Sequence, residues 1–536
     1  MNNDTSTLPF DPPVIRSGLD IISIGITGLL ALLLLSFGVK ALIVTAVKYI
    51  NTWKYLIDGG SIIQAKFDQA TYIRKSNGRS FEVLAPDNRY VFVSSPDHIK
   101  EVDATPDTIL SLQAASKQML QPVYTMHRFN WFDVRGTEGV GFVRALRTLL
   151  TNNLPNILPD LSRIIRSRFS ELQLNFPLID GARHIPVYPT IVQLVVLTNA
   201  VSFFGEDLAK NEQFMVSALA YVEETLICAE IVKLVPKFLG PVIGGIIARR
   251  LKSHDTIYST LLPVAEQRCL ERENAKLGRP VPKHADCIQW IMETSPKHNP
   301  WSAHRVVHEL MAIWFGSVHA LSTTITFAIH DLCLHPEYID PLRKELDGNY
   351  ETFERTAQGL LLLDSFIKES ARLTPVEAMS TRRSAIQPFT LSDGTHLKVG
   401  DWLCTPVKAM MQSPEHYPDP LQFSGFRFAD PQLVALIAGV DGPMQPQPSK
   451  LADVNYSWHV WGTGRMACPG RYYAVAVMKV ILGQMLLNYD CELVEPDAPR
   501  WFTWRSTMLP KEKTLVTFAP RSRKANLGDR ETEASH

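Results

Sequence analysis

Residues 461–474 read W-G-T-G-R-M-A-C-P-G-R-Y-Y-A and lead into an apolar stretch at 475–487. The two glycines and the Cys-Pro-Gly turn predict that Cys468 lies on a tight loop directly before a helix. Unpaired N–H groups at a helix N-terminus favour a thiolate, because they lower the pKa of a nearby cysteine. Gly464 and Gly470 leave room for the backbone to approach a flat ligand. The segment therefore predicts a thiolate that can bind a metal, and a buried free cysteine in a glycine-rich turn is the alternative.

The composition narrows the class of protein. The chain has 536 residues, and its 54 basic and 54 acidic side chains cancel, so no strong field attracts nucleic acid. The 7 cysteines form no C-x-x-C pair and their number is odd, which is typical of reduced thiols on the cytosolic side of a membrane. No G-x-G-x-x-G segment opens a helix after a strand, so we expect no nicotinamide or flavin site. Any electrons must then come from a separate protein.

The N-terminal segment predicts one membrane anchor. Residues 21–39 contain no charged side chain, and a second apolar stretch follows Lys40. Because about 20 apolar residues span a bilayer as a helix, we expect residues 21–47 to form the anchor. Aspartates precede this segment and lysines follow it, which places residues 1–20 in the lumen and the body in the cytosol. A buried core helix is the alternative.

The body after about residue 60 is predicted to be mainly helical with a small β part. Short strands are expected at 80–84 and 90–94, around the turn residues Pro86-Asp87-Asn88, and a hairpin is expected within 389–406, around Ser392-Asp393-Gly394. Long helices are expected over residues 141–152, 314–334 and 475–487. No repeat or linker divides the body, so we predict one α-dominated domain followed by a polar tail at 521–536.

The loop around Cys468 resembles the cysteine-ligand signature of cytochromes P450, F-G-x-G-x-R/H-x-C-x-G, and residues 467–474 are most similar to enzymes of filamentous fungi. The resemblance implies haem b, with its iron ligated by Cys468. It also implies that Trp461, Gly464 and Gly470 surround the cofactor. Trp461 replaces the usual phenylalanine but is still a large ring that can pack near the sulfur. Met466 replaces the basic residue that contacts a haem propionate, so we expect another basic residue to compensate.

A second family motif lies upstream of the cysteine. Glu369 and Arg372 stand at i and i+3 on one helix face, and Pro375 marks the end of that helix. Between this motif and the cysteine, residues 420–428 resemble the family segment whose arginine completes a Glu–Arg–Arg network. The resemblance implies that Glu369, Arg372 and Arg427 form this structural network behind the haem.

The resemblance extends the second of these helices to 306–334, and this helix falls where the family has A/G-G-x-D/E-T. The resemblance places Gly316 where the helix opens above the iron, His319 at the acid position and Ala320 at the position of the usual threonine. In the family, the acid and the threonine relay protons to dioxygen. Alanine has no hydroxyl, so another group must replace the threonine of the relay. One alternative is His319 together with Ser322, Ser317 or a water, and another is the substrate's own hydroxyl. A reaction that needs no relay is a further alternative.

Two arginines are candidates for the missing propionate contact. Arg147 lies in a stretch, 142–151, that resembles the family helix supplying such a contact. Arg383 follows the helix of Glu369 and could supply another.

The resemblance, which covers residues 60 to 520, implies a cytochrome P450 fold at 48–520, preceded by a single transmembrane helix. It further implies a monooxygenase of the endoplasmic reticulum that oxidises a lipophilic small molecule, such as a terpenoid, polyketide or alkaloid of secondary metabolism. NADPH-cytochrome P450 reductase would supply electrons, with cytochrome b5 as an optional second donor and membrane lipid as a further contact. Two other functions stay open: a P450-fold isomerase, lyase or dehydratase without a reductase, and a non-catalytic haem sensor.

Overall fold

The computed structural model describes residues 69–521, except 86–87, 135–140, 236–237, 441, 443–446 and 505. The chain divides into two compact units, Met1–Gln64 and Ala65–His536, and all described residues belong to the second. The expected luminal segment at 1–20, the expected anchor at 21–47 and nearly all of the expected polar tail lie outside the described residues.

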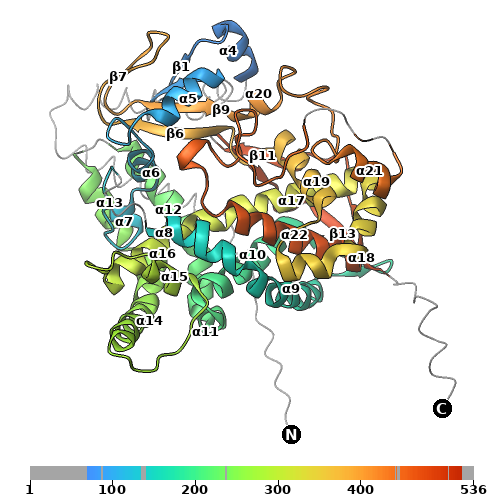
Figure 1. The fold of residues 1–536 in the computed structure, drawn as a ribbon, viewed down its shortest axis with the longest axis horizontal. Coiled ribbons are helices and arrows are strands. Elements are labelled where there is room, and N and C mark those ends of the chain that lie inside the picture. Colours follow the sequence, from blue (N-terminus) through green and yellow to red (C-terminus); the bar gives the residue numbers. More distant parts are fainter. Residues whose placement is uncertain are drawn as a thin grey trace, which may run out of the picture. The chain divides into compact units, whose positions relative to one another are not determined.

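Helices make up most of the described chain, as predicted (Figure 1). Those of the first half are α4 (Gln69–Ser76), α5 (Pro96–Ala104), α6 (Leu112–Leu120), α7 (Pro122–Thr125), α8 (Gly141–Arg144), the π-helical turn η1 (Ala145–Leu150), α9 (Thr151–Gln173), α10 (Val187–Phe204), α11 (Glu206–Ala209), α12 (Glu212–Leu234), α13 (Gly240–Ala248), α14 (Ser253–Lys276) and α15 (Cys287–Glu293). Those of the second half are α16 (Ala303–Ser317), α17 (His319–Leu334), the 3-10 turn η2 (Pro336–Tyr338), α18 (Ile339–Thr356), α19 (Leu361–Leu373), α20 (Val407–Met411), α21 (Pro431–Ala438), the 3-10 turn η3 (Gly464–Met466) and α22 (Arg471–Asn488).

The strands form a minor part, also as predicted. A five-stranded sheet has the order β1-β2-β9-β6-β3, a four-stranded sheet has the order β10-β13-β5-β4, and β11-β12 and β7-β8 are separate pairs. The bounds are β1 (Phe81–Leu84), β2 (Arg89–Phe92), β3 (Leu110–Ser111), β4 (Leu178–Ile179), β5 (Ala182–Pro186), β6 (Met379–Ala385), β7 (Phe389–Thr390), β8 (His396–Leu397), β9 (Trp402–Pro406), β10 (Tyr489–Leu493), β11 (Trp501–Trp504), β12 (Thr507–Pro510) and β13 (Leu515–Pro520).

In the central strands of the five-stranded sheet, successive side chains alternate between the two faces of the sheet. Tyr90 and Phe92 of β2 lie in one apolar cluster and Val91 lies in another, because successive side chains of a strand point to opposite faces. Trp402 and Leu403 of β9 alternate in the same way. The two strands pair in parallel with Val91 opposite Leu403, so each face of the sheet is apolar. Both faces are therefore covered by other parts of the chain.

The expected strands agree with the structure, with one difference. β1 and β2 form the first antiparallel pair, and their turn residues Pro86 and Asp87 lie outside the described residues. β7 and β8 form the predicted hairpin around Ser392-Asp393-Gly394. The apolar run at 402–406, which the sequence placed with that hairpin, instead becomes β9 at the centre of the large sheet. Its partners β2 and β6 are distant in sequence, so local spacing could not reveal this pairing.

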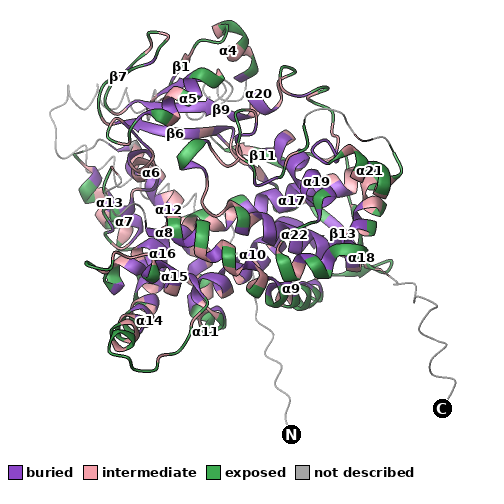
Figure 2. Cartoon of the chain, viewed as in Figure 1, coloured by how far each residue is buried: buried purple, intermediate pink, exposed green. Residues whose placement is uncertain are grey.

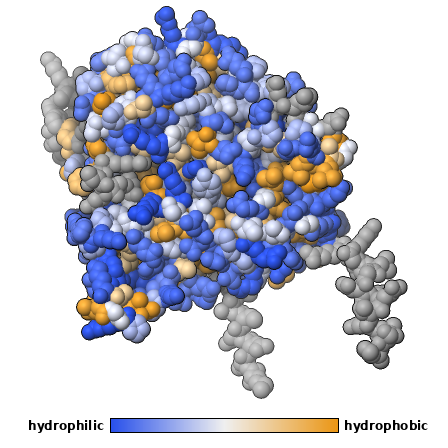
Figure 3. Space-filling view, viewed as in Figure 1, coloured by the Kyte–Doolittle hydropathy of each residue, from blue (hydrophilic) through white to orange (hydrophobic). Residues whose placement is uncertain are grey.

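The main apolar core lies among the long helices, and Figure 2 shows α17, α19 and α22 as largely buried. α22 begins at Arg471, four residues before the predicted start, and its side chains from Val475 to Leu487 are all buried. Val187–Phe204 and Ala303–Leu334 are long and apolar enough to cross a membrane, but both are mostly buried inside the protein. Their burial identifies both segments as helices of the protein core. Figure 3 shows that the visible surface is mostly hydrophilic, with apolar side chains gathered near α21, where Leu436 is 76% exposed.

Two expected helices depart from regular α-helix. The helix predicted over 306–334 is divided into α16 and α17 at Val318, whose φ and ψ are −95° and −66°. The helix predicted over 141–152 does begin at Gly141, but it passes through the π-helical turn η1 before continuing as α9 to Gln173. Breaks and π turns of this kind are common at functional sites.

The N-terminus of α19 is held by a buried carboxylate from α18. Glu345, which is 3% exposed, accepts hydrogen bonds from the backbone N–H groups of Leu362 at 2.8 Å and Leu363 at 3.0 Å. These N–H groups have no partner within their own helix, because the first turn of a helix lacks preceding carbonyls. Glu345 therefore fixes the start of the helix that carries Glu369.

Replacing Glu345 by alanine should leave two buried N–H groups unpaired and lower the free energy of unfolding by about 2–4 kcal/mol. Urea unfolding followed by circular dichroism would measure this loss. The control is Glu351→Ala, an exposed position on the same helix, which should change stability by less than about 0.5 kcal/mol. Equal stability of the two variants would contradict the assigned role of Glu345.

Candidate active site

Cys468 lies on the predicted tight loop, between η3 and α22. Its backbone N–H donates to the carbonyl of Trp461 at 2.7 Å, which closes the loop. Gly462 and Gly464 have φ values of +76° and +55°, a left-handed conformation that favours glycine. The thiol is free and half-buried. In the described part of the chain no group of three or more His, Cys, Asp or Glu residues could hold a metal ion.

Burial raises the pKa of the Cys468 thiol, and this effect outweighs several opposing ones. The backbone N–H groups of Gly470 and Arg471 and the charges of Arg471 and Arg147 lower it. The helix N-terminus effect predicted from the sequence is therefore present, but the lowered pKa predicted from it is wrong for the chain by itself. A coordinated metal ion would supply the remaining positive charge, because a coordinating thiol is deprotonated.

The ring of Trp461 is fixed beside this loop. Its indole N–H donates to the carbonyl of Leu451 at 2.6 Å, and the indole of the buried Trp458 donates to the same carbonyl at 3.2 Å. The ring itself packs against the main core. Since its only polar atom is already paired, Trp461 presents an apolar surface, as the usual phenylalanine would.

Of the predicted compensating arginines, Arg147 contacts the cysteine loop directly. It lies in the π-helical turn η1, and its guanidinium donates to the carbonyls of Arg465 and Ala467, both at 3.4 Å. Met466, next to these two residues, is buried at 9% exposure and brings no charge. The positive charge that the loop itself lacks at this position is therefore supplied from η1.

Arg383 reaches the loop through Asp103, which the sequence analysis did not single out. Arg383 is buried in β6, with its guanidinium 3.7 Å from the Asp103 carboxylate. Asp103, on α5, accepts a hydrogen bond from the Thr463 hydroxyl at 2.9 Å. A Cβ at Gly464 would lie 2.7 Å from this carboxylate, so the lack of a side chain at Gly464 lets Asp103 approach the loop. Burial raises the pKa of Asp103, and Thr463, Arg383 and Arg465 oppose that rise.

The break between α16 and α17 exposes one face of otherwise buried helices. Gly316 and Ala320, four residues apart across Val318, are both exposed. A Cβ on Gly316 would meet no atom within 4 Å, so this side of the helix borders open space. The side chain at Ala320 ends at its methyl group and offers no hydrogen bond to whatever occupies that space.

The two polar candidates near this break have other partners. The His319 ring lies 3.1 Å from the Tyr188 hydroxyl of α10, through Nδ1, and burial lowers the pKa of His319 to about 4. At neutral pH His319 is therefore uncharged. The Ser322 hydroxyl is fully buried and donates to the Val318 carbonyl at 2.9 Å. The structure thus brings Gly316 and Ala320 together on the open face and ties the Ser322 hydroxyl to its own helix. His319 is bound only through Nδ1, and its buried Nε2 has no hydrogen-bond partner among the described residues.

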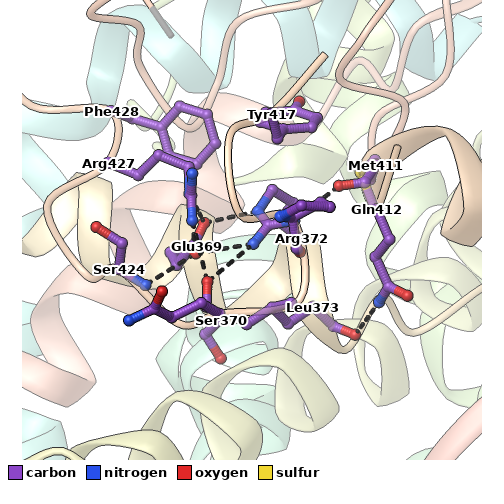
Figure 4. A network of polar contacts seen from close by, with 12 residues as sticks. Glu369, Ser370, Arg372, Leu373, Met411, Gln412, Tyr417, Ser424, Arg427 and Phe428 are labelled. Atoms are coloured by element: carbon purple, nitrogen blue, oxygen red, sulfur yellow. Dashed lines mark hydrogen bonds and ion pairs between the residues drawn. The ribbon is translucent and has the colours of Figure 1, made fainter. Parts of the chain in front are cut away.

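Glu369, Arg372 and Arg427 meet in one buried network (Figure 4). The Glu369 carboxylate accepts from Arg372 at 2.7 and 2.9 Å, from Arg427 at 3.0 and 3.1 Å, and from the backbone N–H of Ser424 at 3.0 Å. The exposed fractions of the Glu369, Arg372 and Arg427 side chains are 0%, 0% and 5%.

The remaining guanidinium groups of the network hold the following chain segment. Arg372 donates to the carbonyls of Met411 at 2.8 Å and Pro420 at 2.6 Å, and Arg427 donates to that of Pro418 at 2.6 Å. Figure 4 shows the two guanidinium groups converging on the carboxylate from α19 and from the later segment. The network therefore ties residues 411–427 to the helix of Glu369.

The comparisons with known proteins agree with this arrangement. The profile of the family described as Cytochrome P450 matches residues 60–518. The relative "Cytochrome P450 monooxygenase paxP" of Penicillium paxilli is 26% identical, over 90% of this chain and 91% of its own. "Ent-kaurene oxidase" of Gibberella intermedia is 29% identical, over 63% of this chain and 62% of its own. Among solved structures, "Retinoic acid bound cyanobacterial CYP120A1" has a TM-score of 0.61 at 17% identity, covers 84% of this chain and 94% of that chain, and is similar in fold.

Replacing Glu369 by alanine should abolish the stable accumulation of the protein, because two buried arginines lose their counter-charge at a cost of roughly 3–5 kcal/mol. The matched control is Glu171→Ala, which breaks an exposed i,i+3 pair with Arg168 and should cost less than about 1 kcal/mol. Thermal unfolding and the yield of soluble protein would be measured for both. A Glu369→Ala protein as stable as the control would show that the network has no structural role.

Proposed function

The chain belongs to the cytochrome P450 family, and we propose that it is a haem-thiolate monooxygenase that oxidises a lipophilic small molecule. The observation that carries the proposal is Cys468, a free and half-buried thiol on a glycine-rich loop with arginine charge beside it. The family match over residues 60–518 and the relatives named as monooxygenases support it.

The residues around Cys468 fit a flat, metal-containing group with acidic side groups. Cys468 would ligate the haem iron, Trp461 would pack near the sulfur, and Arg147 and Arg383 would neutralise the propionates. Bound haem would supply the activation of dioxygen, which a thiolate ligand favours. The Gly316–Ala320 face borders open space and would receive dioxygen and substrate. The chain itself would orient the haem and the substrate. Its buried helices would keep water away from the site.

The proposed substrate is a terpenoid, polyketide or alkaloid of fungal secondary metabolism. Support comes from fungal relatives, one of which is named an ent-kaurene oxidase. Electrons would come from NADPH through cytochrome P450 reductase, with cytochrome b5 as an optional second donor.

Ala320 favours a second candidate, an isomerase, lyase or dehydratase that uses haem without a reductase. Alanine cannot hold a proton for transfer to dioxygen, and the hydroxyl of Ser322 is already turned toward Val318. Candidate metabolites incubated with and without NADPH and reductase separate the two functions. Turnover that needs neither would replace the monooxygenase by the second candidate.

Replacing Cys468 by alanine should abolish the thiolate-type absorption band of the reduced, CO-treated protein, because alanine cannot ligate iron. Cys269→Ala is the control, since Cys269 is also a half-buried free cysteine but lies on α14, and the band should persist in it. A normal thiolate band in the Cys468 variant would refute the assigned ligand.

Deleting residues 1–50 should move the protein from the membrane fraction to the soluble fraction after alkaline extraction, because the proposed anchor at 21–47 is lost. Haem content should be unchanged, since every described residue of the site follows this segment. Deletion of residues 522–536 is the control and should leave the protein in the membrane. If the first truncation still needs detergent, another segment inserts into lipid and the proposed topology, with the body in the cytosol of the endoplasmic reticulum, loses its support.

A further inference from the structure

Asn199 is a polar residue in the middle of the apolar helix α10, and its side chain is fully buried. A buried amide is costly unless its donor and acceptor are both paired. Its Nδ2 donates to the carbonyl of Ser317 at 2.9 Å, and its Oδ1 accepts from the Tyr473 hydroxyl at 3.0 Å. The assignment of the amide is unambiguous, because a carbonyl can only accept and must therefore face the NH2 group.

The first of these bonds reaches the break in the long helix. Ser317 is the last residue of α16, and Val318, which follows it, separates α16 from α17. Helices bend sharply where an outside side chain hydrogen-bonds into their backbone ladder. Gly316 and Ala320, the exposed pair, flank this point. The Asn199 amide thus binds the backbone at the place where the helix opens.

The second bond reaches the cysteine side of the molecule. Tyr473 lies in the first turn of α22, five residues after Cys468, and is buried. Its hydroxyl also lies 3.0 Å from the Ser202 hydroxyl, which donates its own proton to the Thr198 carbonyl at 3.1 Å. The single proton of Tyr473 is therefore shared between Asn199 Oδ1 and Ser202 Oγ. The Tyr473 hydroxyl thus joins the first turn of α22 to the Asn199 amide, whose orientation is set by the Ser317 carbonyl.

We propose that Asn199 is a positioning residue that holds the α16–α17 break open and couples it, through Tyr473, to the helix that follows Cys468. Ala320 has no side-chain hydrogen bond with which to hold the break, and Asn199 does so from α10. The inference rests on the proposed function, since the face that the break exposes is where a ligand of the haem iron would bind. Without the amide, the helix can straighten across Val318 and narrow the open space beside Gly316 and Ala320.

The test uses imidazole, which binds iron opposite a thiolate, as a probe of that space in the haem-loaded protein. Asn199→Leu keeps the side-chain size and removes both hydrogen bonds, so the imidazole Kd should rise about fivefold, the equivalent of one hydrogen bond. Tyr473→Phe keeps the bond from Asn199 to the Ser317 carbonyl and removes the hydroxyl that donates to Asn199 Oδ1, so a smaller rise of about twofold is expected. Asn349→Leu is the control, because Asn349 also donates to a helix carbonyl, at 3.0 Å, but lies on α18.

Optical titration gives the Kd, and thermal unfolding is measured in parallel. An Asn199→Leu protein with lowered stability but the native imidazole Kd would have lost only a structural contact, and the proposal would fall. If that variant does not accumulate, Tyr473→Phe decides, with a native Kd again overturning the proposal. Failure of the proposed function is distinguishable, because then the unmodified protein itself would lack the thiolate-type CO band and any imidazole-induced shift.

Discussion

A carboxylate taken wholly out of water must be paired, and in this protein that requirement organises the chain around the cysteine. Glu369 is buried between two guanidinium groups, and those groups in turn bind backbone carbonyls of a segment that is distant in sequence. Such a network adds little net stability compared with apolar packing, but removing one partner leaves a buried charge unpaired and is strongly destabilising. The Arg372–Met411 and Arg427–Pro418 bonds thereby fix the path along which the chain proceeds toward Cys468.

The loop of Cys468 is then held from several independent elements. Arg147 binds two of its carbonyls, Asp103 accepts from Thr463, and the Leu451 carbonyl accepts the indoles of Trp458 and Trp461. None of these contacts needs the thiol itself. The position of the sulfur is therefore set by the surrounding chain. A metal ligand needs such support to keep a fixed coordination geometry.

Local spacing was sufficient to predict what depends on local contacts. The i,i+3 pair of Glu369 and Arg372, the hairpin of β7 and β8 and the tight loop that carries Cys468 all belong to this class. The resemblance placed a helix opening at Gly316, but local spacing could not reveal the hydrogen bond from Asn199 to Ser317, because the two residues are 118 positions apart. Asp103 was missed for the same reason, since its partners Thr463 and Arg383 lie in other elements. The raised pKa of Cys468 reflects burial, which a motif does not report.

Charge explains how a loop with methionine at position 466 can still serve an anionic cofactor. Four arginines lie at or near the loop. Arg383 and Arg465 have the carboxylates of Asp103 and Asp107 as partners, so part of their charge is offset, and the remainder on Arg383 would still face the propionates in the proposed complex. Arg147 and Arg471 instead donate to the uncharged carbonyls of Ala467 and Cys468, and both lower the pKa of the thiol. Among the described residues neither arginine pairs with a carboxylate, so with haem bound as proposed their charge would help to balance a thiolate and two propionates. The site thus requires net positive charge near the sulfur. Arg147 of η1 and Arg471 of α22 supply this charge, whereas Met466 at the motif position does not.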